Sequence, residues 1–392
     1  MRNFYYSLSF LYDKLEQNFI LEKLEKMIET ANIYEKLMEH LTQMAMMCPT
    51  RSELLVMLKE NITQEEAKIL LAIPSDVIPF EGVTAEKIAN TLNMPEVELN
   101  DHLIRLTKKG LLFSNKNKAC QEEYALQQVG YGFPQTFFWK GEDTPHSRKM
   151  ASHVLKYFNT EVTREVYCTD PLPYRFVPVD EVIEPEKAAI LPYQVMKKII
   201  ENAKVICVAH CICRITTKLK GKGCEHPTEV CMKFDDLARY MIDKNFGREI
   251  TKKEALEISK MAESEGLVHF TDNSIENVQQ NCNCCGCSCW NLGRIKRRML
   301  PRDEIIATYF IRETIEENCT GCGNCIEICP VDAITIKKDK ASIDLNWCVG
   351  CGLCVSKCPN DAIKIVYRKD LKYDLPEPSF QCLHKNILKT RK

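Results

Sequence analysis

The spacing of hydrophobic and polar positions predicts a long helix at the start of the chain. Within residues 1–48, apolar side chains recur every three or four positions, while Glu and Lys fill the opposite face. This predicts a helix with one apolar face, which Pro49 ends. The apolar face consists of Leu21, Leu24, Ile28, Ala31, Tyr34, Met38 and Leu41. A stripe of this kind faces a core or makes a dimer contact.

Shorter amphipathic segments follow over residues 51–115. The pattern predicts helices at 52–61, 63–72, 85–92 and 95–109, and a strand that begins at Leu111. The run "TAEKIANTLNMPEVELNDHLIRLTKKGLLF" resembles the winged-helix modules of many regulators. The resemblance implies a recognition helix at 95–109, whose buried stripe is Leu99, Leu103 and Leu106.

The charge of this segment argues against DNA as its partner. Residues 51–109 carry seven Lys or Arg and ten Asp or Glu, a net charge of 7 − 10 = −3. DNA phosphate attracts positive charge, but Glu96, Glu98 and Asp101 face outward on the expected recognition helix. The cations on the same helix are Arg105, Lys108 and Lys109. We therefore expect protein contact or dimerisation here, with DNA binding as the less favoured reading.

The second half of the chain mixes short strands and helices. Residues 126–180 are rich in Gly, Pro and aromatic side chains, which is typical of an ordered connector with strand pieces. Beyond it, the pattern predicts helices at 186–203 and 252–266, and strands at 205–208 and 267–270.

Composition changes this picture mainly through cysteine. The 392 residues have a formal net charge of −1 and contain no apolar run of about 20 residues, so we expect a cytoplasmic chain without a membrane span. Of its 22 cysteines, eighteen lie between Cys207 and Cys358. In a reducing compartment, thiols clustered at short spacings are metal ligands first.

The strongest signal is an internal repeat with the pattern C-x2-C-x2-C-x3-C-P. Its first copy is Cys319, Cys322, Cys325 and Cys329, followed by Pro330, and its second is Cys348, Cys351, Cys354 and Cys358, followed by Pro359. In such a pattern the first three thiols bind one [4Fe–4S] cluster, and the fourth binds the other. We assign cluster I to Cys319, Cys322, Cys325 and Cys358, and cluster II to Cys348, Cys351, Cys354 and Cys329. Zinc is disfavoured, because four-cysteine zinc sites use two C-x2-C pairs separated by a loop.

Residues 314–367 resemble the 2[4Fe–4S] bacterial-type ferredoxins. The resemblance implies a low-potential carrier of single electrons. The β-branched residues around the cysteines, Ile334, Ile336, Ile343, Ile363 and Ile365, are expected to screen the clusters from water.

Ten further cysteines lie between residues 207 and 289. The candidate ligands for an upstream metal site are Cys211, Cys213, Cys224, Cys231, Cys282, Cys284, Cys285 and Cys287, and we prefer Cys211, Cys213, Cys231 and one or two of the last four. Cys207 follows an apolar strand and is expected to be a core thiol. A further [4Fe–4S] cluster is favoured over zinc with His210 or His226 as a ligand, and over a redox-active thiol pair.

The runs "CICR", "GCEHPTEVC" and "CNCCGCSC" resemble a module found ahead of two-cluster ferredoxin domains in anaerobic bacteria and archaea. The resemblance implies redox metal chemistry. Beside it lies a basic run of Arg294, Lys296, Arg297 and Arg298, which is a solvated helix face or a surface that steers an acidic redox partner.

These observations predict a multidomain α+β chain. Its parts are N-terminal helices (1–48), a winged-helix-like domain (49–125), a connector (126–180), a cysteine-rich module (181–303), a two-cluster ferredoxin domain (304–370) and a tail (371–392). No dinucleotide-binding, Walker A or haem-attachment motif is present. We therefore expect an iron–sulfur electron-transfer protein, or the ferredoxin-like subunit of an oxidoreductase complex.

Two rival functions stay open. One is a redox- or iron-sensing transcription regulator, and the other is an enzyme with an open iron in the upstream cluster. The favoured reading makes the chain an electron-transfer component with one or more redox partner proteins. It also makes the N-terminal region a contact in a homo-oligomer or a complex.

Overall fold

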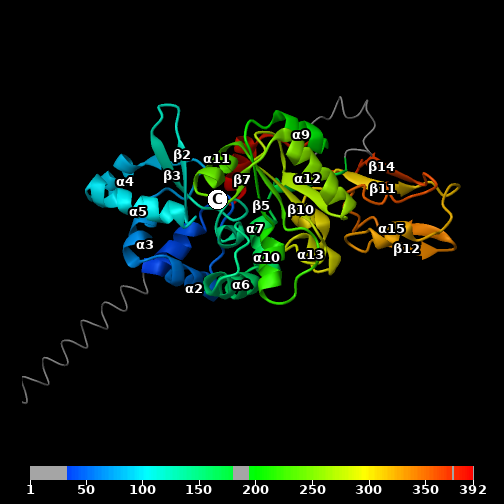
Figure 1. Cartoon of the computed structure of the whole chain (residues 1–392), viewed down its shortest axis with the longest axis horizontal. Coiled ribbons are helices and arrows are strands. Elements are labelled where there is room, and N and C mark those ends of the chain that lie inside the picture. The colour runs from blue at the N-terminus through cyan, green and yellow to red at the C-terminus, as the bar shows by residue number, and fades with distance from the viewer. Residues whose placement is uncertain (1–32, 180–193, 373–374, 392) are drawn as a thin grey trace, which may run out of the picture.

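The computed structural model describes residues 33–179, 194–372 and 375–391. The N-terminal helices lie at one end, a six-stranded sheet lies in the middle, and the cysteine repeat forms the other end (Figure 1). The predicted α+β class is confirmed. Among the helices of the described residues, none has the length and apolar character that crossing a membrane requires.

The first described helix ends at Leu41, seven residues earlier than the sequence pattern predicts. The backbone after it bonds elsewhere: Met46 N donates to Gln128 Oε1 at 2.9 Å, and Val129 N donates to Met46 O at 3.1 Å. The described part of the apolar face, Tyr34, Met38 and Leu41, is buried in this chain's own core. The other members, Leu21, Leu24, Ile28 and Ala31, lie outside the described residues.

The helices predicted over 52–109 are confirmed. The elements are α2 (Ser52–Asn61), α3 (Gln64–Leu71), β1 (Val83–Thr84), α4 (Ala85–Leu92), α5 (Glu96–Lys108), β2 (Leu112–Lys116) and β3 (Glu122–Leu126). Thr63 begins α3 with a capping box, in which its side chain accepts from Glu66 N while the Glu66 carboxylate accepts from Thr63 N. The three strands form one sheet in the order β1-β3-β2.

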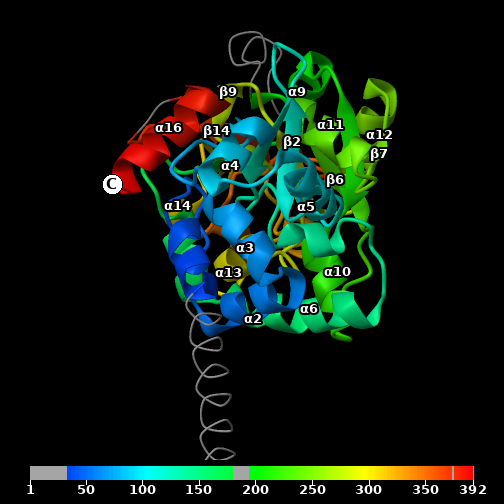
Figure 2. The same ribbon diagram turned by 90° about the vertical axis from the view of Figure 1, so that its left-hand side faces the viewer.

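The region expected to be a connector contains two helices that the sequence analysis missed. Its elements are η1 (Gln135–Phe138), α6 (Pro145–Tyr157), α7 (Thr160–Tyr167) and β4 (Tyr174–Val177). Thr144 caps α6, with Pro145 in its first turn, and Asn159 caps α7, so both starting signals stand in the sequence. Helix α6 lies beside α2 and α10 (Figure 2).

The central sheet is antiparallel throughout, with the strand order β4-β8-β10-β6-β5-β7. Its strands and flanking elements are α9 (Met196–Asn202), β5 (Ile206–His210), α10 (Ile212–Leu219), β6 (Glu229–Phe234), α11 (Asp235–Asp243), β7 (Arg248–Glu249), α12 (Lys252–Ser264), β8 (Val268–Asp272), β9 (Ser274–Glu276) and β10 (Gln280–Cys284). Of the helix predicted at 186–203, residues 186–193 lie outside the described part, and α9 begins only at Met196.

The cysteine repeat follows as small two-stranded sheets, β11-β14 and β12-β13. The elements are α13 (Leu292–Lys296), α14 (Arg302–Ile305), β11 (Phe310–Thr314), α15 (Asn324–Glu327), β12 (Ile334–Lys337), β13 (Lys340–Ile343) and β14 (Ile363–Tyr367). Of the isoleucines expected to shield the clusters, Ile336 is 38% exposed, whereas Ile334 and Ile363 are buried.

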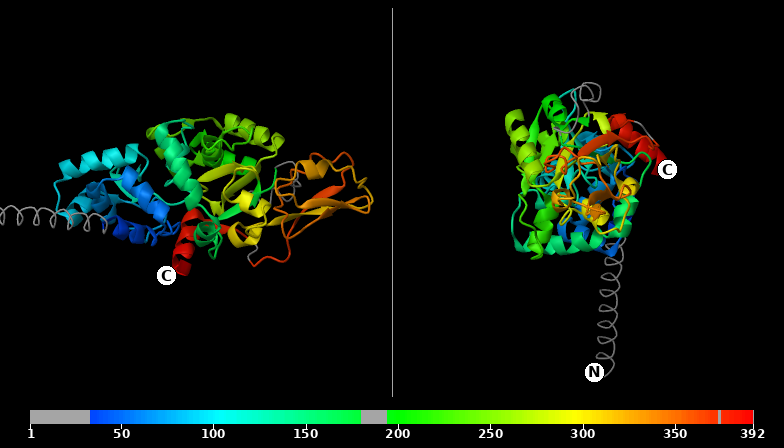
Figure 3. Two further views of the ribbon diagram at one scale, coloured as in Figure 1. Left: turned by 90° about the horizontal axis from the view of Figure 1, so that it is seen from below. Right: turned by 90° about the vertical axis from the view of Figure 1, so that its right-hand side faces the viewer.

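The expected tail returns to the middle of the molecule. Strand β15 (Glu377–Ser379) pairs in parallel with β9, and α16 (Phe380–Arg391) packs beside it (Figure 3). The imidazole of His384 on α16 lies 2.9 Å from the Tyr131 hydroxyl, which donates to Asp272 Oδ1 at 2.8 Å. Three segments far apart in the sequence are thereby held together inside the core.

Candidate metal centres

Two tight loops place the first three cysteines of each repeat. Gly321 and Gly323 in the first loop, and Gly350 and Gly352 in the second, all have positive φ angles, which glycine adopts without strain. A Cβ on Gly350 would lie 2.0 Å from the carbonyl oxygen of Phe310. The backbone therefore approaches its surroundings more closely than any other residue type permits.

The loops and the following turns bring the eight cysteines together as two crossed sets. One cavity is lined by the four thiols predicted for cluster I: Cys319, Cys322, Cys325 and Cys358. A second cavity is lined by the four predicted for cluster II: Cys329, Cys348, Cys351 and Cys354. Each cavity thus takes three thiols from one repeat and the fourth from the other. This is the arrangement that the spacing predicts, and the ligand assignment itself stays a prediction.

Backbone amides point at several of these sulfurs. Ala341 N lies 3.4 Å from Cys319 Sγ. Ala333 N lies 3.3 Å from Cys329 Sγ, and Ala362 N lies 3.3 Å from Cys358 Sγ. The bond from Ala341 lowers the pKa of Cys319, whereas burial raises the pKa of Cys354 to about 12. N–H groups that donate to sulfur suit a thiolate ligand, because they stabilise its negative charge.

Arg312 on β11 lies between the two cavities and lines both of them. Its side chain is 1% exposed, and its Nε and Nη1 atoms have no oxygen or nitrogen acceptor. Burial acts to lower the pKa of Arg312, but the neighbouring thiols of Cys325, Cys354 and Cys348 raise it overall. A buried cation with free donors fits two anionic clusters. The sequence analysis missed Arg312, although a lone arginine in the strand "FIRET" beside the repeat was a usable signal.

Upstream, seven thiols line one cavity: Cys211, Cys213, Cys231, Cys282, Cys284, Cys285 and Cys289. We call it the six-thiol cavity, after the six thiols other than Cys285, because Cys285 also belongs to a second group described below. Cys282 and Cys284 are two positions apart on β10 and so share a face. The neighbouring strand β6 brings Cys231 to a distance of 3.8 Å between its sulfur and that of Cys282. Cys289, which the sequence analysis left out, interacts with Cys213 and Cys284.

The thiols of the six-thiol cavity share negative charge unequally, because hydrogen bonds to Cys282 raise the pKa of Cys231 and Cys284. Hydrogen bonds from Cys231 and Cys284 lower the pKa of Cys282 well below its usual range. Two cations, Arg214 and Lys233, also line the cavity, and both are at most 2% exposed. These features suit a metal bound by thiolates.

The cavity also presents buried donors without partners. Trp290 Nε1 and Arg214 Nε have no oxygen or nitrogen acceptor among the described residues. Both side chains line the six-thiol cavity. Sulfide and thiolate sulfurs of an iron–sulfur centre would accept from such donors.

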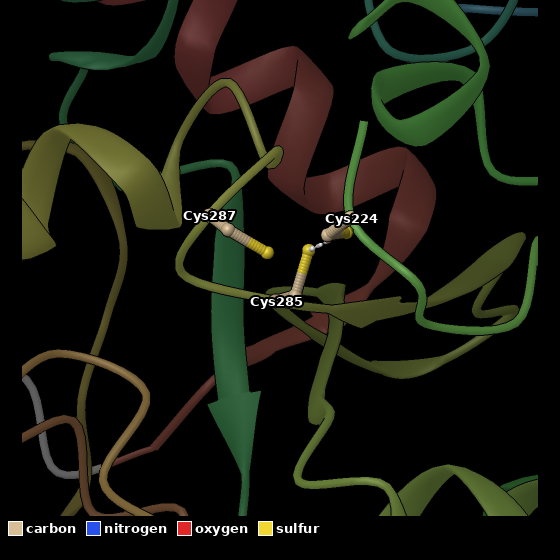
Figure 4. Close-up of side chains that lie close together, drawn as sticks. All are labelled: Cys224, Cys285 and Cys287. Carbon is tan, nitrogen blue, oxygen red and sulfur yellow. Dashed lines mark hydrogen bonds between the residues drawn. The ribbon is translucent and has the colours of Figure 1, made fainter. Parts of the chain in front are cut away.

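Three thiols converge at the border of this cavity. The sulfurs of Cys224, Cys285 and Cys287 all lie within 4.8 Å of one another and could hold a metal ion (Figure 4). We call them the three-thiol group. The predicted eight candidates are therefore divided: five join Cys289 around the six-thiol cavity only, Cys224 and Cys287 belong to this second group only, and Cys285 belongs to both. Neither His210 nor His226 belongs to the group. Cys207 is a buried core thiol, as predicted.

The upstream module contacts the cysteine repeat directly. A Cβ on Gly286 would lie 1.9 Å from the carbonyl oxygen of Pro330, the residue after Cys329. Val179 N donates to Cys351 O at 2.9 Å. Both Cys329 and Cys351 line the second cavity, so this cavity is the one next to the upstream thiols.

The basic run is part of the same contact. Arg298 donates to Val331 O at 2.9 Å, and its guanidinium lies 4.6 Å from the centre of the Trp347 ring. Lys296 pairs with Asp332 at 3.3 Å. These side chains hold the repeat against the module although Arg298 itself is exposed, and the steering of a redox partner by this run stays a prediction.

Comparison with known proteins identifies the repeat. The family model of the 4Fe-4S dicluster domain matches residues 318–363. An uncharacterized polyferredoxin-like protein of Methanocaldococcus jannaschii is 44% identical over 59 residues, which are 14% of this chain and 35% of that protein. The chain thus spans about a third of the length of this relative. No solved structure matches the chain significantly. The chain therefore carries a 4Fe–4S dicluster domain near its C-terminus, and such a domain indicates electron transfer.

Proposed function

We propose that the protein relays single electrons through the two clusters of its dicluster domain to a third iron–sulfur centre in the six-thiol cavity. It acts as a soluble electron-transfer protein or as the ferredoxin-like subunit of an oxidoreductase. The observation that carries the proposal is the contact at Gly286 and Pro330, which sets the second four-cysteine cavity against the module that holds the six thiols.

The two four-cysteine cavities differ in their exposure, which suggests a direction along the chain of centres. Cys322 of the first cavity is exposed, whereas Cys348, Cys351 and Cys354 of the second are buried. A redox partner therefore approaches cluster I most closely, and cluster II connects it to the upstream centre. Each cluster, when bound, takes up or releases one electron.

The residues around the upstream cavity are suited to a third centre. Four thiolates hold the four irons of a fully ligated cubane, and the cavity is lined by more than that number. Lys233, held by Gln280 Oε1 at 2.6 Å, and Arg214 compensate the charge that thiolates bring into the core. We propose a further [4Fe–4S] cluster here.

The N-terminal helices and their three-stranded sheet are proposed to be a winged-helix-like unit that contacts protein. Arg105 of α5 and Lys109 just after it pair with the buried carboxylate of Glu66, at 2.7 Å and 3.9 Å. Part of their positive charge is thereby compensated within the unit. Val97 and Ile104 on α5 are 82% and 48% exposed. This exposed apolar surface favours a protein partner over DNA.

Metal analysis and rapid kinetics test the relay. The anaerobically purified chain should contain about twelve irons and matching sulfide, eight from the dicluster domain and four from the upstream cubane. When a low-potential one-electron donor is mixed with the protein, freeze-quench EPR should show the dicluster centres reduced before the upstream centre. The Cys348→Ala variant should slow upstream reduction at least about tenfold.

The matched control is Cys120→Ala, which changes an exposed cysteine outside every thiol group described above. It should leave both the iron content and the order of reduction as in the parent protein. An upstream centre that is reduced at the parent rate in Cys348→Ala would contradict the relay.

A further inference from the structure

The three-thiol group differs in kind from the cysteine sets that suit iron–sulfur clusters. Among the described residues, only Cys224, Cys285 and Cys287 form a group in which three ligand atoms all lie within 4.8 Å of one another. Neither four-cysteine set of the dicluster domain meets that condition, and no three thiols of the six-thiol cavity do. In a cubane each thiolate binds a different iron, so its ligands stand farther apart than two ligands of one ion.

The sulfur spacing matches a single tetrahedral ion. The sulfurs of Cys224 and Cys285 are 3.8 Å apart. With metal–sulfur bonds of about 2.3 Å, two corners of a tetrahedron also lie about 3.8 Å apart. Figure 4 shows Cys285 and Cys287 on one segment with their sulfurs near each other, and Cys224 on a second segment beside Cys285.

The local fold explains how this group forms beside the six-thiol cavity. Strand β10 ends at Cys284, Cys285 follows it and still lines the six-thiol cavity, and the turn at residues 286–288 carries Cys287 out of that cavity. Cys224 reaches them from the segment between α10 and β6. The chain thereby builds a second set of soft ligands at the border of the cavity, with Cys285 belonging to both.

One side of the group faces solvent. Cys287 is exposed, Cys224 is partly exposed, and only Cys285 is buried. Ser288 Oγ, which accepts from the Thr217 hydroxyl at 3.1 Å, lies 3.3 Å from the Cys224 sulfur. A hydroxyl at this position can orient a water molecule next to the ion.

From this geometry we propose that Cys224, Cys285 and Cys287 bind one zinc ion whose fourth position takes an exchangeable ligand. Thiolates favour zinc in a tetrahedral site, and sites with three protein ligands keep the fourth position for water or a substrate. The exchangeable ligand is water or a small thiol, because a fourth thiolate completes a set of soft donors. The site is independent of the proposed electron relay, since zinc does not change its oxidation state.

Metal analysis of the full chain tests the site. The purified protein should contain about one zinc per chain in addition to iron, and the Cys224→Ser and Cys287→Ser variants should lose the zinc while keeping the parent content of iron and acid-labile sulfide. The control Cys382→Ser changes an exposed cysteine on α16 and should keep the zinc. Because Cys287 is exposed, its variant tests the site even if Cys224→Ser does not fold.

Cobalt substitution tests the geometry and the open position. Protein with Co²⁺ in place of zinc should show the visible bands of tetrahedral cobalt and a thiolate charge-transfer band, and added β-mercaptoethanol should shift the visible bands. Loss of iron and sulfide in Cys287→Ser would overturn the proposal, because the thiol would then belong to a cluster. Absence of zinc together with absence of cobalt bands would overturn it as well. Cobalt bands that do not shift when the thiol is added would overturn the proposal that the fourth position takes an exchangeable ligand.

Discussion

The dicluster domain and the upstream thiol region bring their thiols together in different ways. In the dicluster domain, a short repeated pattern places three thiols on each loop and sends the fourth across to the other cavity. Upstream, the thiols come from separate places: the start of α10, strand β6, strand β10 and the segment before α13. The first arrangement is local and duplicated, whereas the second exists only when a sheet has formed.

The two regions also differ in the groups that compensate the negative charge of their thiols. In the dicluster domain, one buried arginine lies between the two cavities, and backbone amides approach the sulfurs. In the upstream region, two buried cations and two tryptophans line a single cavity. Backbone loops therefore dominate the first environment, and side chains dominate the second.

The largest expected effect on metal content follows from replacing Cys358, the ligand that the second repeat supplies to cluster I. Cys358→Ala should remove the cluster otherwise held by the first repeat, with a loss of about four irons, and spare cluster II. Iron analysis and low-temperature EPR of the reduced variant measure this. Loss of the cluster held by Cys348, Cys351 and Cys354 instead would show that the repeats do not exchange ligands.

The next effect concerns the thiol that only the fold reveals. Cys289→Ser should abolish the upstream iron–sulfur centre and leave the roughly eight irons of the dicluster domain, because Cys289 is part of the six-thiol cavity. Cys207→Ala is the matched control, since that buried thiol lies in the core outside the cavity. Equal iron content in both variants would remove Cys289 from the ligand set.

A smaller effect is expected where the two regions touch. Gly286→Ala forces a methyl group against the Pro330 carbonyl, which should cost roughly 1–3 kcal/mol of stability by overpacking. Electron transfer between the dicluster domain and the upstream centre should slow, with iron content unchanged. Stopped-flow spectroscopy and thermal unfolding report the two changes, and a parent-like transfer rate would mean that this contact does not position the centres.

The smallest effect is electrostatic. Arg312→Met removes a buried positive charge beside both cavities, which should lower both dicluster reduction potentials by on the order of tens of millivolts. The sign follows because the reduced cluster carries one more negative charge, and a nearby cation stabilises it. Arg312→Lys keeps the charge, so its potentials in a spectroelectrochemical titration should lie close to those of the parent protein. Unchanged potentials in Arg312→Met would exclude Arg312 as a tuning residue.

Part of the fold was predictable because its signals are local. The helices of residues 52–108 follow from apolar spacing and from caps such as Thr63 and Thr84. Helices α6 and α7 carry similar caps but were obscured by the Gly-, Pro- and aromatic-rich stretch before them. The early end of the first helix was not predictable, because it depends on the contact of Met46 with Gln128, 82 residues away.

The sequence by itself determined the two crossed cysteine sets, because a ligand loop with fixed spacing and glycines at its turns folds the same way wherever it stands. Only the tertiary structure decided which upstream thiols meet. The pairing of β6 with β10 brings Cys231 to Cys282, and the turn at residues 286–288 carries Cys287 away from the six-thiol cavity toward Cys224. Tertiary structure likewise placed Arg312 between the clusters and Cys289 in the cavity. The physical reason is that strand register and long-range packing, which spacing along the chain does not encode, set these distances.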